Sequence, residues 1–184
     1  MPCTHSLSVV LQVAPAVAPL LKTAWEHAGE NWLERLNSAV QAAVDALTAT
    51  EPLPRPYEIA LYLTTDAEIR ALNHLYRGID APTDVLSFGY DAPDGTHPAP
   101  ESPDLPPLGD LVISVETAHR QAALNGHDLR TELLMLTLHG TLHLMGYDDS
   151  TDAERAAMNA RAALTLRALG YPAREDWHSR YEKI

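Results

Sequence analysis

The sequence contains a single cysteine, Cys3, among 184 residues. It therefore has no internal disulfide framework and no zinc site built from thiolates, a usage typical of proteins in a reducing cytosol. No apolar run approaches the ~20 residues that a membrane-spanning helix needs. The first residues also lack the basic and apolar regions of a signal peptide. These absences predict a soluble, cytoplasmic protein with no membrane partner.

Basic residues are scarce as well. Lys and Arg number 13 against 25 Asp and Glu, which gives a net charge of −12 at pH 7. Nucleic-acid binders normally carry a basic surface, because neutralising phosphates supplies much of their affinity. A nucleic-acid function therefore requires a partner protein that adds binding energy, or a local basic patch. The residues available for such a patch are Arg70, His74, Arg77, His119, Arg120 and Arg130.

The length and a hydrophobic fraction of 46% are typical of one globular domain, here spanning residues 1–184. Apolar periodicity, capping residues and turn residues predict an α+β fold, with a small mixed sheet of about four strands packed with about five helices. The last two strands are expected to pair antiparallel. The predicted strands are 6–14, 57–63, 84–88 and 110–115. The predicted helical regions are 15–49 with a break near Gly29, 65–78, 116–125, 129–145 and 152–169. The proline-rich residues 91–107 are predicted to form a surface loop.

The segment TELLMLTLHGTLHLMG is apolar nearly all the way round, which predicts a buried helix. His139 and His143 are four residues apart on it and so share one helical face. Histidines on apolar helices often serve packing alone, but two neutral imidazoles at this spacing can share a zinc ion at ~2.0–2.1 Å. The turn that follows can bring Asp148 or Asp149 back to the ion. Three protein ligands and an open position are typical of a catalytic zinc.

The same spacing occurs in metalloproteases, where a helix supplies two ligands and the turn after a glycine, here Gly146, supplies the third. Those proteases place a glutamate directly after the first histidine as general base, whereas this chain has Gly140. The pattern therefore favours hydrolysis of something other than a peptide bond. Glu132 lies on the helical face of His139, where it either orients an imidazole or belongs to the polar first turn.

A second cluster is LNHLYRGIDAPTDVLSF, residues 72–88. Arg77 ends a predicted helix, where a cation is favoured by the helix dipole, but its planar donor fork also suits a phosphate. Asp80, Thr83 and Asp84 are interpreted as ordinary residues of a turn leading into the strand. The residues themselves leave both interpretations of Arg77 open.

Taken together, HGTLHLMGYDD (139–149), LNHLYRGIDAPTDVLSF (72–88) and LGDLVISVETAHRQA (108–122) strongly resemble the YbeY family of metal-dependent endoribonucleases, also described as rRNA maturation factors. The matching segments run in the family's order across about residues 57–150. The resemblance implies a single-domain α+β hydrolase that carries one zinc ion and no small-molecule cofactor. It implies action on single-stranded RNA and rRNA precursors, notably at the 3′ end of small-subunit (16S) rRNA, in ribosome maturation and quality control.

The resemblance also implies roles for individual residues. The family's ligands normally read His-x3-His-x5-His, and the first two map onto His139 and His143. Asp149 stands in place of the third histidine, while Asp148 occupies the family's own aspartate position. Asp149 is therefore the predicted third metal ligand; carboxylates bind zinc well, although the added charge makes the ion a weaker Lewis acid. The family's functionally important arginine maps onto Arg77, so the predicted catalytic residues are Arg77, His139 and His143.

Zinc lowers the pKa of a bound water to about 7, which yields hydroxide near neutral pH. In a ribonuclease this hydroxide can attack the phosphodiester or deprotonate the 2′-hydroxyl, while Arg77 stabilises the phosphoryl oxygens. No protein general base is identified. Two alternatives remain: a ribosome-associated accessory factor with a chiefly structural metal, and a small metallohydrolase acting on a non-RNA substrate. The terminal segment AREDWHSRYEKI, residues 173–184, is predicted to be a docked peptide rather than a second site.

Overall fold

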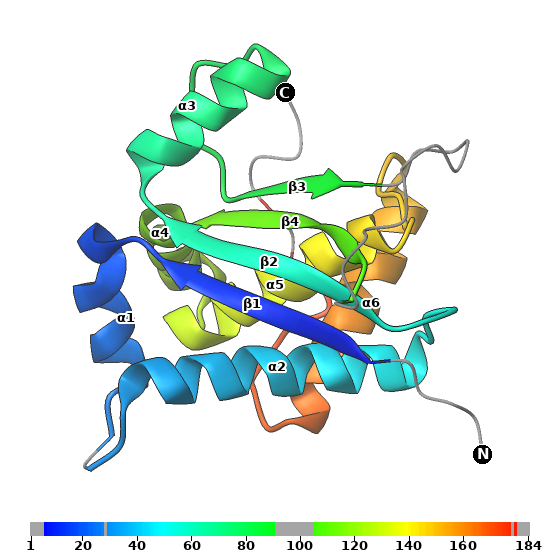
Figure 1. Ribbon diagram of the computed structural model, residues 1–184, viewed down its shortest axis with the longest axis horizontal. Helices are drawn as coiled ribbons and strands as arrows, with labels where there is room; N and C mark the ends of the chain where they lie inside the picture. The colour runs from blue at the N-terminus through cyan, green and yellow to red at the C-terminus, as the bar shows by residue number, and fades with distance from the viewer. Residues whose placement is uncertain (1–5, 28, 91–104, 178, 180–184) are drawn as a thin grey trace.

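Four strands form one mixed sheet in the computed structural model, which describes residues 6–27, 29–90, 105–177 and 179 (Figure 1). Their order across the sheet is β1-β2-β4-β3. β1 pairs parallel to β2 and β2 pairs parallel to β4, whereas β3 pairs antiparallel to β4 and leaves one edge free. The strands are β1 (Leu7–Val13), β2 (Tyr57–Thr64), β3 (Val85–Gly89) and β4 (Pro107–Ser114).

The helices begin where polar side chains can satisfy their free amide groups. Thr151 and Glu154 form the capping box that the sequence predicts, with the Thr151 hydroxyl accepting from the Glu154 amide. Asn31, Thr65, Ser114 and Asp128 cap other helices in the same way. The helical elements are η1 (Pro15–Val17), α1 (Ala18–Trp25), α2 (Trp32–Thr50), α3 (Asp66–Arg77), α4 (Val115–Asn125), α5 (Leu129–Leu144) and α6 (Asp152–Ala168).

Helices cover the two sheet faces unequally. In the view of Figure 1, α4, α5 and α6 lie behind the sheet, α2 runs along the β1 side and α3 lies beyond β3. α5 is the central helix of this layer, because it packs on β3 and β4 and also against α2, α4 and α6. The main core lies between these helices and the sheet and includes Leu36, Val44, Ile59, Leu61, Leu111, Ile113, Leu134, Leu138, Ala163 and Leu166.

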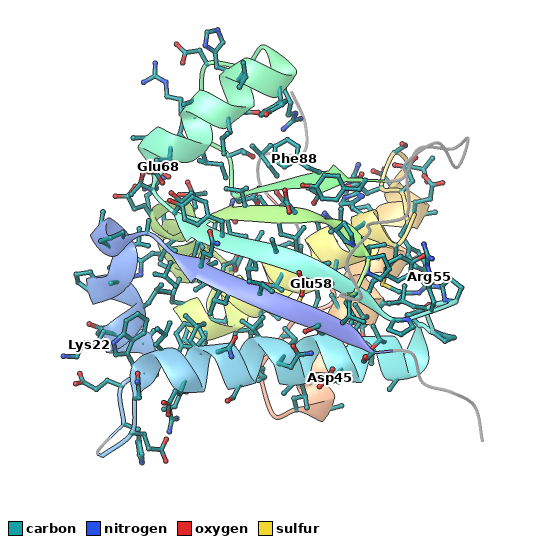
Figure 2. All side chains as sticks on the ribbon, in the orientation of Figure 1. Lys22, Asp45, Arg55, Glu58, Glu68 and Phe88 are labelled. Carbon is teal, nitrogen blue, oxygen red and sulfur yellow. The ribbon has the colours of Figure 1, made fainter. Side chains whose placement is uncertain are left out.

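A smaller apolar cluster joins α3 to the opposite face of the sheet. Ile69 of α3 packs there with Leu86 of β3 and Val112 of β4, and Phe88 lies against them (Figure 2). This contact holds the C-terminal end of α3 beside the free edge of β3.

The predicted α+β fold with about four strands and about five helices is confirmed, as is the antiparallel pairing of the last two strands. The predicted helical region 15–49 is interrupted between α1 and α2, where Gly29 has a φ of +82°. The boundary of the proline-rich loop was wrong, because Pro107 already belongs to β4. Residues 91–104 of that loop lie outside the described residues. Within the described ranges, no helix is long and apolar enough to cross a membrane.

Two glycines face each other where β3 and β4 begin to separate. Gly89 pairs with Gly109, next to an irregularity in the pairing of β4 with β2. A Cβ added to Gly109 would lie 2.4 Å from the carbonyl oxygen of Phe88 and 2.6 Å from Cδ2 of Leu144. A Cβ on Gly89 would have Leu144 Cδ2 at 3.9 Å as its nearest neighbour, which is an ordinary contact. The absence of a side chain at Gly109 therefore lets α5 and β3 approach β4 closely.

Gly109→Ala should lower the free energy of unfolding by about 1–3 kcal/mol, the usual cost of forcing an extra carbon into a packed site. Gly89→Ala is the matched control and should be nearly neutral, since the added methyl makes only an ordinary contact with Leu144. Urea denaturation followed by circular dichroism measures both. Equal stability of the two variants would show that β4 does not approach its neighbours this closely.

Candidate metal centre

The two histidines of the site project from the last turns of α5. Asp128 caps the start of this helix by accepting from the Thr131 amide at 2.9 Å. His139 is only 2% exposed, because the sheet and neighbouring helices surround this part of α5. The His143 side chain lies one turn nearer the end of the helix and is 28% exposed. One imidazole is therefore fixed within the core, and the other borders solvent.

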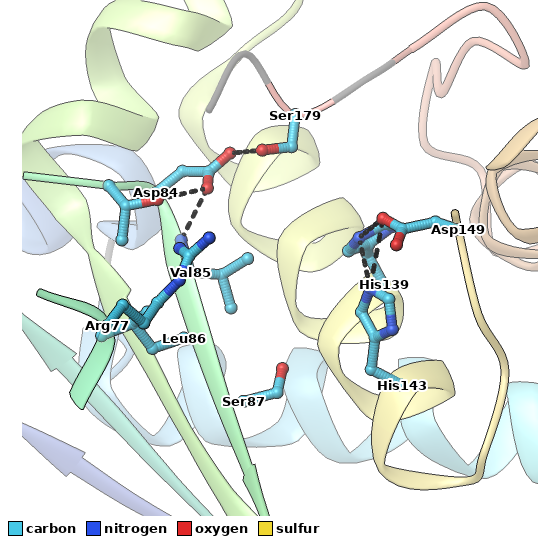
Figure 3. Close-up of a pocket in the computed structure, with 10 residues that line it drawn as sticks. Arg77, Asp84, Val85, Leu86, Ser87, His139, His143, Asp149 and Ser179 are labelled. Carbon is cyan, nitrogen blue, oxygen red and sulfur yellow. Dashed lines mark hydrogen bonds and ion pairs between the residues drawn. The ribbon is translucent and has the colours of Figure 1, made fainter. Parts of the chain in front are cut away.

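The turn after α5 carries the carboxylate. Gly146 has a φ of +96°, which a glycine adopts without strain, and the Tyr147 amide then donates back to the Leu142 carbonyl at 3.0 Å. Asp148 accepts from the Asp149 amide at 2.8 Å and from the Ser150 hydroxyl at 2.6 Å, so its carboxylate stabilises the turn. Asp149 is consequently the aspartate that faces the imidazoles (Figure 3).

The three donor atoms lie close to the spacing that one tetrahedrally coordinated ion requires, with the two imidazole nitrogens slightly closer together than that ideal. Nε2 of His139 and Nε2 of His143 are 3.1 Å apart, and Oδ2 of Asp149 is 3.6 Å from the first and 3.4 Å from the second. Ligand atoms bound to one zinc ion at about 2.0–2.2 Å lie about 3.3–3.6 Å from each other. These residues also form the one group able to hold a metal ion among the described His, Cys, Asp and Glu side chains. Two imidazoles and a carboxylate are a suitable donor set for zinc.

A backbone contact selects the tautomer of His143. Its Nδ1 lies 3.1 Å from the carbonyl oxygen of Tyr147, which can only accept a hydrogen bond. The proton therefore resides on Nδ1, and the lone pair of Nε2 points toward the shared ligand position. Tyr147 is itself anchored, since its hydroxyl bonds Glu51, the residue after α2, and the guanidinium of Arg161 in α6 lies 4.9 Å from its ring centre. The turn is thus tied to both neighbouring helices.

The three candidate ligands form one wall of an open pocket of about 330 Å³. Arg77 stands on the opposite wall, where α3 ends beside β3, and the Ser87 hydroxyl also faces the space between them (Figure 3). The predicted catalytic and metal residues are therefore brought together from three separate elements. The complete lining is Arg77, Thr83, Asp84, Val85, Leu86, Ser87, His139, His143, Asp149 and Ser179.

Asp84 is part of this pocket, although its sequence context indicated only a turn. Its carboxylate is 1% exposed and accepts from the Val85 amide at 2.8 Å, from Gln121 at 3.2 Å and from the Ser179 hydroxyl. Burial raises the pKa of Asp84 above its ordinary value, and these hydrogen bonds oppose that increase. Its neighbour Thr83 lines the pocket as well. Nothing in the local spacing indicated this, because Gln121 and Ser179 are distant in sequence.

The structure explains why Gly140 replaces the metalloprotease glutamate. A Cβ at this position would lie 2.7 Å from Cδ2 of Leu111 and 3.1 Å from Oγ of Ser87. Helix α5 thus contacts the sheet directly here, and a glutamate has no room. This close contact removes the position from which a metalloprotease supplies its general base.

Glu132 lies in the first turn of α5, as one of the two interpretations of the sequence expected, but it is not a solvent-facing polar residue. It is completely buried in the first turn of α5, where it accepts from Trp177 Nε1 at 3.1 Å and from Asn125 at 3.2 Å and contacts the His127 imidazole. The Trp177 ring in turn packs edge-on against His139, with 5.6 Å between ring centres. Glu132 therefore contacts the tryptophan that packs against His139.

The basic patch considered from the sequence does not assemble at this pocket. Of its six residues, only Arg77 lines the pocket that contains the candidate ligands. Arg70 pairs with Asp80 at 2.7 Å and Arg120 pairs with Asp66 at 2.8 Å. The remaining cations are spread over other surfaces; His119 and Arg130, for example, line a separate depression beside α1.

Fold and site together define a small α+β protein with three side chains that could hold a metal ion at the end of a buried helix. Residues 25–170 match the family described as "Endoribonuclease YbeY", and the chain belongs to that family. The chain is similar to endoribonuclease YbeY of Moorella thermoacetica, with 46% identity over 143 residues, covering 77% of this chain and 89% of the relative. Endoribonuclease YbeY of Picosynechococcus sp. is 43% identical over 152 residues, covering 83% of each chain.

The fold also resembles a solved structure. A Thermotoga maritima protein determined in solution superposes with a TM-score of 0.51 at 21% identity, covering 88% of this chain and 87% of that one. This likeness concerns the fold alone.

Loss of a residue that only supports a metal ligand typically weakens metal binding about 10–100-fold. Asp149→Asn changes a ligand itself, so it should weaken zinc binding by more than that. The amide keeps the shape of the side chain but removes the charged donor. Asp148→Asn is the matched control, because it removes the same charge from the adjacent residue and should change the affinity little. Competition with a chromophoric chelator measures both dissociation constants. Similar losses in the two variants would assign the effect to charge alone and remove Asp149 from the ligand set.

Proposed function

We propose that this chain is a zinc-dependent endoribonuclease that cleaves single-stranded RNA. Within that role we propose action on rRNA precursors at the 3′ end of small-subunit (16S) rRNA, in ribosome maturation and quality control, with the ribosome or a ribosomal protein as partner. The low cysteine content agrees with a cytoplasmic location. The observation that carries the proposal is the convergence of His139, His143 and Asp149 opposite Arg77 in a member of an endoribonuclease family.

A divalent ion at this site supplies an activated water and polarises a phosphoryl oxygen. Arg77 contributes the second positive group, since its planar fork can donate two hydrogen bonds to one phosphate. Asn73, one turn earlier in α3, contacts this guanidinium, with its Oδ1 3.5 Å from Arg77 Nη1. Asn73 is 2% exposed and is fixed by donating to the Ala81 carbonyl at 2.8 Å. Arg77 thus projects into the pocket from a fixed base on the wall opposite the candidate ligands.

The local charge of the site offsets the acidity of the whole chain. A divalent cation bound by two neutral imidazoles and one carboxylate retains a net positive charge, and Arg77 adds another. The attraction between these positive charges and a phosphate a few ångströms away is strong in a partly buried pocket. The repulsion between the phosphate and distant surface acids is screened by salt over about 8–10 Å. RNA is therefore held mainly where the phosphodiester meets the pocket, and a ribosomal partner supplies the affinity that the rest of the surface lacks.

Arg77→Ala should reduce kcat for cleavage of a fluorescent single-stranded RNA by about 10²–10³-fold, the usual effect of removing one donor to developing charge. Arg70→Ala is the matched control, since Arg70 lies two turns earlier on α3 and pairs with Asp80 outside the pocket. Its kcat should stay close to wild type. An unchanged kcat in the Arg77 variant would remove this residue from the catalytic machinery.

Chelation of the metal should abolish RNA cleavage and leave the fold intact, because apolar packing between the helices and the sheet forms the core. Circular dichroism should be unchanged, and added zinc should restore activity. His143→Ala should likewise keep the fold and lose turnover. Unfolding of the chelated protein would instead favour an accessory factor with a structural metal. A metal-loaded, folded protein that cuts no RNA but hydrolyses another substrate class would favour the non-RNA hydrolase.

The identity of the nucleophile is tested with a substrate carrying a single 2′-deoxynucleotide at the cleavage position. Cleavage of this substrate indicates attack by water on the phosphodiester, whereas resistance indicates attack by the neighbouring 2′-hydroxyl.

A further inference from the structure

A short C-terminal segment packs against the metal helix although it lies beyond the family match. The match ends at residue 170, whereas the segment comprises Ala173–Trp177 and Ser179, which we call the strap. Ala173, Trp177 and Ser179 are each no more than 4% exposed. The strap is thus anchored by three buried side chains, while its residues 174–176 are exposed, and it reaches the candidate metal centre at two points.

The first point is Trp177. Its ring lies edge-on to the His139 imidazole at 5.6 Å between centres, with an angle of 60° between the ring planes. Its indole Nε1 donates to both carboxylate oxygens of Glu132, at 3.1 and 3.2 Å. Its backbone carbonyl accepts from Nδ2 of the buried Asn159 at 2.5 Å. The tryptophan is therefore fixed at its ring and at its backbone.

Glu132 explains why this tryptophan cannot easily be exchanged. A completely buried carboxylate is costly unless hydrogen bonds satisfy it, and Asn125, His127 and the indole together provide them. The position of the indole is consequently defined by a polar network and not by apolar packing alone. The indole ring is therefore held in one position beside His139.

The second point is Ser179. Its hydroxyl bonds the buried Asp84, and both residues line the pocket that contains the ligands (Figure 3). The strap therefore links the start of β3 to the same pocket.

We propose that the strap is a positioning element of the metal centre, in which Trp177, held by Glu132 and Asn159, fixes His139 in its metal-binding orientation. The proposal rests on the metal site of the proposed function. Trp177 binds no metal itself; it limits the rotation of the imidazole, so that less freedom is lost when the ion binds. Supporting residues of this kind typically change metal affinity by about 10–100-fold.

The test compares Trp177→Leu with Trp25→Leu in the full chain. Trp25 is a matched control, because it is similarly buried, at 3% exposed, but lies in α1 beside a depression that contains none of the ligands. Zinc dissociation constants come from chelator competition, and the stability of each metal-free protein comes from urea denaturation. Trp177→Leu should weaken zinc binding about 10-fold or more. Trp25→Leu should lose stability while keeping the wild-type zinc affinity.

A third variant separates the ring from its hydrogen bond. Trp177→Phe keeps an aromatic wall but cannot donate to Glu132, so its zinc affinity should fall between those of wild type and Trp177→Leu. A wild-type affinity in Trp177→Leu overturns the strap proposal and leaves the metal site standing. A wild-type protein that binds no zinc overturns both.

Spectroscopy tests the contact even if the leucine variant does not fold. In a protein that carries Trp25→Phe and Trp32→Phe, Trp177 is the only indole, and Co²⁺ bound to His139 should quench its emission strongly. A companion with Trp177→Phe and Trp32→Phe retains only Trp25 and should respond weakly. Strong Co²⁺ absorption with no quenching of Trp177 would contradict the contact and overturn the proposal.

Discussion

The packing of α5 directly onto the sheet is the constraint on which the rest of this structure depends. Gly140 lets the helix approach Leu111 and Ser87 without an intervening side chain, and Gly109 does the same for β4 near the end of α5. This closeness buries α5 on nearly every side, and it also determines where the two imidazoles emerge. His139 lies within the core and His143 borders solvent, and both line the pocket, because the helix has no freedom to rotate between its neighbours.

The same packing determines the chemistry that the site can perform. Since no side chain fits at residue 140, the protein has no glutamate next to its first ligand, and the pocket wall opposite the ligands is built from β3 and the end of α3. That wall presents a guanidinium and a serine hydroxyl, which suit a phosphate. A ligand group arranged as in a metalloprotease thereby faces a wall whose polar groups suit a phosphate, in a member of an endoribonuclease family.

The sequence predicted what depends on neighbouring residues. The apolar pattern predicted the buried helix, the i, i+4 spacing put both histidines on one face, and Gly146 marked the turn that returns a carboxylate. These features follow from helix geometry and glycine's backbone freedom. The resemblance to the YbeY family, not the spacing, selected Asp149 over Asp148.

Features made by distant residues were not predictable in this way. The burial of Asp84 depends on Gln121 and Ser179, and the role of Glu132 depends on Trp177, 45 residues further along the chain. The predicted basic patch does not form at the pocket, for a related reason. Arg70 and Arg120 form ion pairs with acids brought close by the fold, and sequence spacing carries no information about such partners.

The division of the candidate ligands between a helix and the turn after it has a consequence for mutation. His139 and His143 belong to α5, whose packing against the sheet fixes their positions, while Asp149 belongs to a partly exposed turn held by Tyr147 and Glu51. A substitution that loosens this turn can therefore displace the carboxylate without disturbing the core, so the third donor can change in evolution independently of the fold.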